Sequence, residues 1–94
     1  MEIIIKFHQT YFNNGYFNIP AQFNNHFGEH GNEIKITTPG TTFNGKINKK
    51  STYNKHPRIM GGKYFRDWLK NKNLLNHEVK LIIISKNHIS IELS

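Results

Sequence analysis

The sequence contains no cysteine among its 94 residues. Disulfide frameworks and thiolate metal sites are therefore excluded, and a reducing compartment is favoured. No apolar run approaches the roughly 20 residues that a membrane span needs, and the opening residues 1–7 are too short and wrongly charged for a signal peptide. We expect a cytoplasmic protein that forms a single domain over residues 1–94.

Acidic residues are scarce and basic residues are clustered. The chain has 13 Lys and Arg against 6 Asp and Glu, a net charge of +7. Residues 46–72 hold nine of the basic residues and one acid, Asp67, so that this window is +8 and the remainder is −1. A bias toward Lys, Asn and Ile explains how many lysines there are but not why they cluster. Clustered charge of one sign favours a polyanionic partner, here a nucleic acid.

The shortage of acids also limits the catalytic possibilities. One spacing resembles that of metal-dependent nucleases, in which carboxylates hold a divalent cation and a lysine orients the attacking water: Asp67, Glu78 and Lys80. His26 and His30 have the four-residue spacing of helical metal ligands, but Gly28 lies between them and no acid-rich partner follows. We therefore expect no catalytic residue, no metal and no cofactor, and keep a small metal-dependent nuclease as an alternative.

Hydrophobic patterning predicts a mainly β protein. Apolar or alternating stretches typical of strands occupy residues 2–7, 16–19, 33–38, 41–50, 57–60, 78–85 and 88–94. Aromatic residues at helical spacing predict two short helices, over residues 21–27 and 63–72. About seven short strands in so short a chain favour a small barrel or sandwich.

The segment 46–58 carries the strongest functional signal, because lysines and an arginine that can neutralise phosphates alternate with side chains that can read base edges. We expect it to form the tip of a hairpin that binds nucleic acid. Its proposed contact residues are Lys46, Asn48, Lys49, Lys50, Ser51, Thr52, Tyr53, Asn54, Lys55, His56 and Arg58. The plain alternative is a solvated basic loop.

The segment 8–16 has a similar polar content without charge, so it would contact bases or sugars, although its Asn-Asn-Gly end is also a simple turn signal. Its proposed contact residues are His8, Gln9, Thr10, Tyr11, Asn13, Asn14 and Tyr16. Exposed tyrosines would also suit a barrel that binds single strands or RNA by stacking, and Tyr11, Tyr16 and Tyr53 leave that alternative open.

The order of these pieces resembles the pseudobarrel DNA-binding domain known from plant transcription factors as the B-three domain. The same fold serves as the specificity domain of bacterial restriction endonucleases of the EcoRII and BfiI kind. Three patterns carry the resemblance: NNGYFNIPAQF at residues 13–23, Phe43 leading into the basic segment, and FRDWLKNKNLLNHEVKLII at residues 65–83. Lys72 and His77 depart from the pattern, and both departures touch the scaffold.

The resemblance implies a seven-stranded open pseudobarrel whose two arms, residues 8–16 and 46–58, enter the major groove of double-stranded DNA. It also implies sequence-specific binding without catalysis, as a free-standing relative or a specificity domain joined to a nuclease domain or subunit.

Overall fold

Short strands account for most of the regular structure. The computed structural model describes residues 1–50 and 56–93. Its strands are β1 (Glu2–Lys6), β2 (Tyr16–Asn18), β3 (Glu33–Thr38), β4 (Thr41–Asn48), β5 (Arg58–Met60), β6 (Glu78–Ser85) and β7 (His88–Glu92). All seven lie within the stretches that the sequence predicts as strands.

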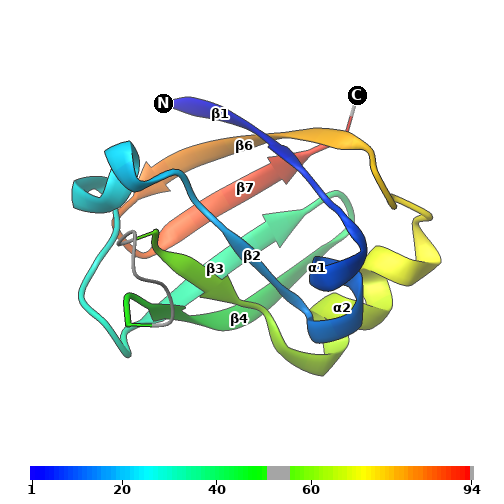
Figure 1. Ribbon diagram of the computed structural model, residues 1–94, viewed down its shortest axis with the longest axis horizontal. Coiled ribbons are helices and arrows are strands. Elements are labelled where there is room, and N and C mark those ends of the chain that lie inside the picture. Colours follow the sequence, from blue (N-terminus) through cyan, green and yellow to red (C-terminus); the bar gives the residue numbers. More distant parts are fainter. Residues whose placement is uncertain (51–55, 94) are drawn as a thin grey trace.

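The strands form one sheet in the order β1-β6-β7-β3-β4-β5-β2. The pair β3–β7 is parallel, and the other neighbouring pairs are antiparallel. The sheet curls so that its two end strands, β1 and β2, face each other across an open seam (Figure 1). The predicted mainly β, seven-stranded open pseudobarrel is therefore confirmed.

Three short helices accompany the sheet, one more than the sequence predicts. The 3-10 helix η1 (Ala21–His26) and the helix α2 (Gly62–Asn71) occupy the two predicted positions, whereas α1 (Gln9–Asn14) lies in the segment expected to be a loop. Among the described residues, no helix is long and apolar enough to cross a membrane.

The additional helix α1 forms because its two aromatic residues are anchored. Tyr11 and Phe12 are buried, and the Phe7 and Tyr11 rings meet edge to face with centroids 6.4 Å apart. Because polar residues flank this apolar pair in the sequence, the sequence pattern does not indicate a helix here. Figure 1 shows α1 beside α2 at one end of the molecule, while η1 lies at the other end.

A single core fills the curl of the sheet. Alternation along the strands places one row of side chains inside, so that Ile3 and Ile5 are buried while Ile4 points outward. From α2, Phe65, Trp68 and Leu69 enter the core at the predicted helical spacing. Burying large side chains of this kind supplies about 1.5–3 kcal/mol each.

Gly15, at the end of α1, packs closely against the start of α2, the helix that follows β5. It ends α1 in the left-handed conformation (φ 69°), and its carbonyl oxygen accepts a hydrogen bond from the Gly61 amide at 2.9 Å. A Cβ at Gly15 would lie 2.7 Å from the Gly62 carbonyl oxygen, closer than real contacts allow. The position therefore requires glycine for both its backbone angles and its close packing.

We predict that Gly15→Ala lowers the free energy of unfolding by about 3 kcal/mol, because it adds overlap with backbone to the cost of a left-handed alanine. Gly40→Ala is the matched control. Gly40 also has a positive φ (89°), but nothing lies within 4 Å of its added Cβ, so we expect a loss of about 1 kcal/mol. Urea unfolding of both variants measures the difference, and equal losses would contradict the packing argument.

Candidate nucleic-acid interface

The β4–β5 hairpin presents polar side chains on its outer face. In β4, Gly45 and Ile47 are buried, so alternation places Asn44, Lys46 and Asn48 outside. The predicted hairpin is confirmed, since β4 and β5 pair in antiparallel register on either side of residues 49–57.

Strand pairing extends this outer face into rows that cross three strands. Asn48 lies opposite Arg58, and Arg58 lies opposite Asn18 of β2. Two residues along each strand, Lys46 lies opposite Met60, which in turn lies opposite Tyr16. Side chains in directly opposed positions are close enough to act together on one ligand.

A groove of about 500 Å³ runs along this face. It reaches from Asn14 of α1, in the first predicted arm, to Asn48 at the base of the second arm. Its lining is Asn14, His30, Gly31, Glu33, Asn44, Gly45, Lys46, Ile47, Asn48, Met60, Gly61 and Gly62. The two predicted arms therefore stand at opposite ends of one groove.

The base of the second arm is fastened to η1. The Lys49 ammonium donates to the carbonyl oxygens of Asn24 at 3.2 Å and Phe27 at 3.1 Å, and the Lys49 amide donates to His30 Nδ1 at 3.0 Å. On the other side of the arm, His56 Nδ1 lies 3.0 Å from the Ile19 carbonyl oxygen. These bonds hold the two ends of the arm against the body of the molecule.

This arrangement changes the expected role of Lys49. Its place in the basic segment predicts a phosphate contact, but its ammonium donates to two carbonyl groups of the protein. Neighbouring Lys50 is exposed, and its amide donates to Asn48 Oδ1 at 2.9 Å. We therefore assign Lys49 to holding the arm in place, whereas the phosphate contact of Lys50 stays a prediction.

The first predicted arm is a helix with one groove-facing residue. Gln9 donates to Asn13 Oδ1 at 2.9 Å and Asn14 donates to the Thr10 carbonyl oxygen at 2.9 Å, both along the exposed side of α1. Only Asn14 of these lines the groove.

The expectation of an exposed ring at Tyr11 is wrong. Tyr11 is 8% exposed, because its ring packs between those of Phe7, His8 and Tyr16. A buried ring cannot serve as a stacking platform. Tyr16 is half-buried and lies beneath the Arg58 guanidinium.

Five of the proposed contact residues lie outside the described part of the chain, namely Ser51, Thr52, Tyr53, Asn54 and Lys55. Three further polar residues that were not predicted lie on or beside the outer face of the described structure, namely Asn18, Asn44 and Tyr64. Asn18 and Asn44 alternate outward in predicted strands, a signal present in the sequence, and Tyr64 of α2 is 78% exposed beside Asn44. Helical spacing explains Phe65 and Trp68 as core residues but gives no hint of Tyr64.

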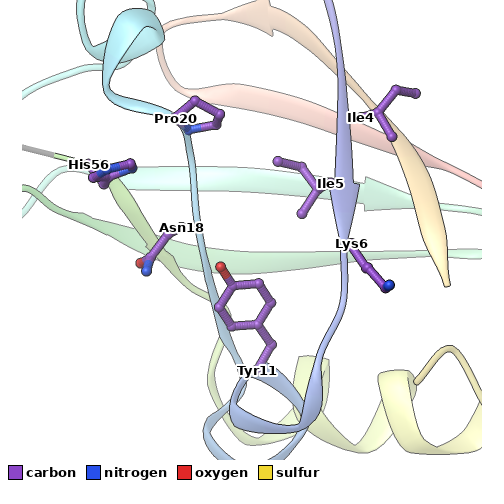
Figure 2. A pocket seen from close by; sticks show the side chains of 7 residues that line it. All are labelled: Ile4, Ile5, Lys6, Tyr11, Asn18, Pro20 and His56. Atoms are coloured by element: carbon purple, nitrogen blue, oxygen red, sulfur yellow. The ribbon is translucent and has the colours of Figure 1, made fainter. Parts of the chain in front are cut away.

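The seam between β1 and β2 forms a second pocket, of about 420 Å³. Its lining is Ile4, Ile5, Lys6, Tyr11, Asn18, Pro20 and His56. In Figure 2, Ile5 and the Tyr11 hydroxyl point into the seam, whereas Asn18 turns toward β5. Asn18 thus belongs to the outer face described above.

The nuclease-like residues have partners of their own. Asp67 lies 3.8 Å from Arg66 on α2, and Lys80 lies 3.7 Å from Glu2 across β1 and β6. Within residues 1–50 and 56–93, no group of three or more His, Asp or Glu side chains could hold a metal ion.

Comparison with known proteins identifies the fold. No protein-family model matches the chain, and no curated protein matches it. The structure of the hypothetical Arabidopsis thaliana protein At1g16640.1 has a TM-score of 0.68 at 15% identity, covering 97% of this chain and 86% of that one. The N-terminal domain of Helicobacter pylori LlaJI.R1 has a TM-score of 0.65 at 16% identity, covering 98% and 85% respectively. At such identities the likeness establishes a shared pseudobarrel fold.

We predict that Lys49→Met lowers the free energy of unfolding by about 1–2 kcal/mol, because the variant keeps the aliphatic stem but leaves two carbonyl groups without their charged donor. Lys50→Met is the matched control, and as an exposed substitution it should change stability by less than about 0.5 kcal/mol. Urea unfolding compares the two variants, and an equal effect would remove the structural role of Lys49.

Proposed function

We propose that this chain binds double-stranded DNA in a sequence-specific manner, with the groove face of β4, β5 and β2 toward the major groove and the two arms at its sides. The observation that carries the proposal is the convergence of basic and amide side chains on one outer face, along a groove that joins both arms. The pseudobarrel fold shared with the two solved structures supports it.

The shape of this face suits duplex DNA. The major groove is about 12 Å wide and admits a two-stranded β-ribbon. The hairpin of β4 and β5 is such a ribbon, and its outer side chains are polar except for Met60, while inner ones such as Ile47 and Ile59 are buried in the core. Binding along this face would therefore expose no part of the core.

The cations of the face would provide affinity. Lys46 and Lys50 are exposed and make no ion pair within the described part of the chain. Each lysine that neutralises a phosphate releases counterions, which strengthens binding at low salt. Glu33 also lines the groove, opposite Lys46, and limits how much negative charge can approach there.

The asparagines would provide base recognition. Bidentate pairing with adenine needs both the oxygen and the amide group of the side chain. Asn48 already accepts a hydrogen bond through Oδ1, and Asn14 already donates one through Nδ2. Asn44 has no side-chain hydrogen bond to any described residue, so it is the strongest groove asparagine for reading adenine.

Catalysis, on this proposal, belongs to another domain or chain. The chain would act as a specificity domain of a restriction endonuclease, or as a free-standing relative of one, in the cytoplasm. The resemblance in residues 13–23 and 65–83 supports this part of the proposal.

We predict that the double variant Lys46→Met and Lys50→Met makes the negative slope of log K against log salt shallower by roughly two units, because two phosphate contacts are lost. Fluorescence anisotropy of a labelled duplex between low and moderate salt gives the slope. Lys80→Met is the control: it removes the same charge from β6, where Lys80 pairs with Glu2, and should leave the slope unchanged. An equal drop in the control would show that only net charge matters.

Competition by single-stranded DNA or RNA at one fixed salt concentration separates the duplex reading from the single-strand alternative. We expect an unlabelled duplex to displace the labelled one at lower concentration than either single strand. The reverse order would overturn the proposed function.

We predict that the isolated chain leaves supercoiled plasmid intact in magnesium or manganese. Asp67 and Lys80 are engaged in separate ion pairs, which does not favour a joint metal site. Agarose gels read the outcome, with Glu78→Ala as the paired variant. Nicking by the parent chain that disappears in Glu78→Ala would establish the nuclease alternative.

A further inference from the structure

Arg58 occupies the centre of the outer face and is held there from two sides. It lies between Asn48 and Asn18 in the strand register. Its Nε donates to Asn18 Oδ1 at 2.9 Å, and its Cζ lies 4.0 Å from the centroid of the Tyr16 ring. Both supporting residues come from β2, the strand that directly follows the first arm.

These two contacts fix the plane of the guanidinium group. A free arginine side chain loses rotamer entropy when a ligand immobilises it. Stacking on Tyr16 and the bond from Nε have already restricted Arg58 in the unbound protein. A group restricted in advance loses less entropy on binding, which increases both affinity and selectivity.

The same contacts leave the terminal nitrogens available. Within the described residues, Arg58 has no hydrogen bond beyond the one from Nε and no ion pair with an acid. This differs from Lys49, whose ammonium is satisfied by carbonyl groups of the protein. Arg58 is therefore a fixed cation with two parallel donors and no internal acceptor for them.

We infer that Arg58 reads a guanine of the bound DNA through its two terminal nitrogens, with Tyr16 and Asn18 as positioning residues. This inference rests on the proposed function. Two donors in a rigid plane match the O6 and N7 acceptors of guanine in the major groove. The same planar pair of donors also fits two phosphate oxygens, and it is the place of Arg58 on the middle strand of the face, between β4 and β2, that favours a base edge. Lys46 in the neighbouring row and Lys50 are both exposed, and their flexible side chains already supply cations for the DNA backbone.

The first step of the test is selection of a binding site from random duplexes with the unaltered protein, which should give a site that contains an invariant guanine. Replacing that guanine by 7-deazaguanine removes one acceptor and should weaken binding roughly 10-fold or more. The same replacement should have no further effect on Arg58→Ala. An equal loss in both proteins would overturn the assignment.

Arg58→Lys is the matched variant, since it keeps the charge and removes the two-pronged donor. It should lose the preference for guanine at that position by roughly 10- to 100-fold while the salt slope stays unchanged. Arg58 would instead be a phosphate contact if Arg58→Ala weakened binding equally for all sequences and made the negative salt slope shallower by about one unit. That result overturns the inference and leaves the proposed function standing.

The positioning residues have their own test. Tyr16→Leu and Asn18→Ala should each reduce discrimination for guanine without changing the salt slope. Tyr16→Phe keeps the ring and should therefore keep the discrimination of the unaltered protein. Loss of discrimination in Tyr16→Phe would show that the Tyr16 ring does not position Arg58. Absence of any duplex binding at low salt by the unaltered protein would overturn the proposed function itself, and the inference with it.

Discussion

The three-residue strand β5 determines the geometry on which the interface depends. It pairs with β4 on one side and β2 on the other, so it brings the outer side chains of three strands into one surface. The second arm precedes it, and α2 follows it. Through the hydrogen bond between Gly61 and Gly15, its far end also fixes the start of β2 and hence the first arm. This short strand thus links the second arm to the first through its pairing and this hydrogen bond.

Much of the fold can be predicted from the sequence, because alternation along 33–38 and 78–85 and the helical spacing of Phe65 and Trp68 are strong local signals. The helix α1 cannot, since its buried pair Tyr11 and Phe12 is surrounded by polar residues that also suit a turn. The residue types of the candidate site can be predicted from the sequence, but their arrangement cannot. Basic and amide residues are visible in the sequence, but which of them meet is decided by register between strands far apart in the chain. Arg58 and Asn18 are 40 residues apart.

The structure also changes how the clustered charge is understood. Sequence alone treats every lysine in 46–58 as an anchor, yet Lys49 holds its own hairpin to η1. Arg66 in α2 is half-buried and lies beside Asp67. On the described part of the groove face, the cations available to a ligand differ in kind: flexible ones at Lys46 and Lys50, and a fixed one at Arg58. Affinity and selectivity would then come from different residues of one face.

The most direct measurement of this account is the response of backbone amide resonances of the labelled protein to titration with its selected duplex. If the groove face binds DNA, the largest shifts map to Asn14, Asn44, Lys46 and Arg58, with small shifts on the outer side of β1 and β6. Large shifts centred on Ile4 and Ile82 instead, with the groove face unchanged, would contradict it.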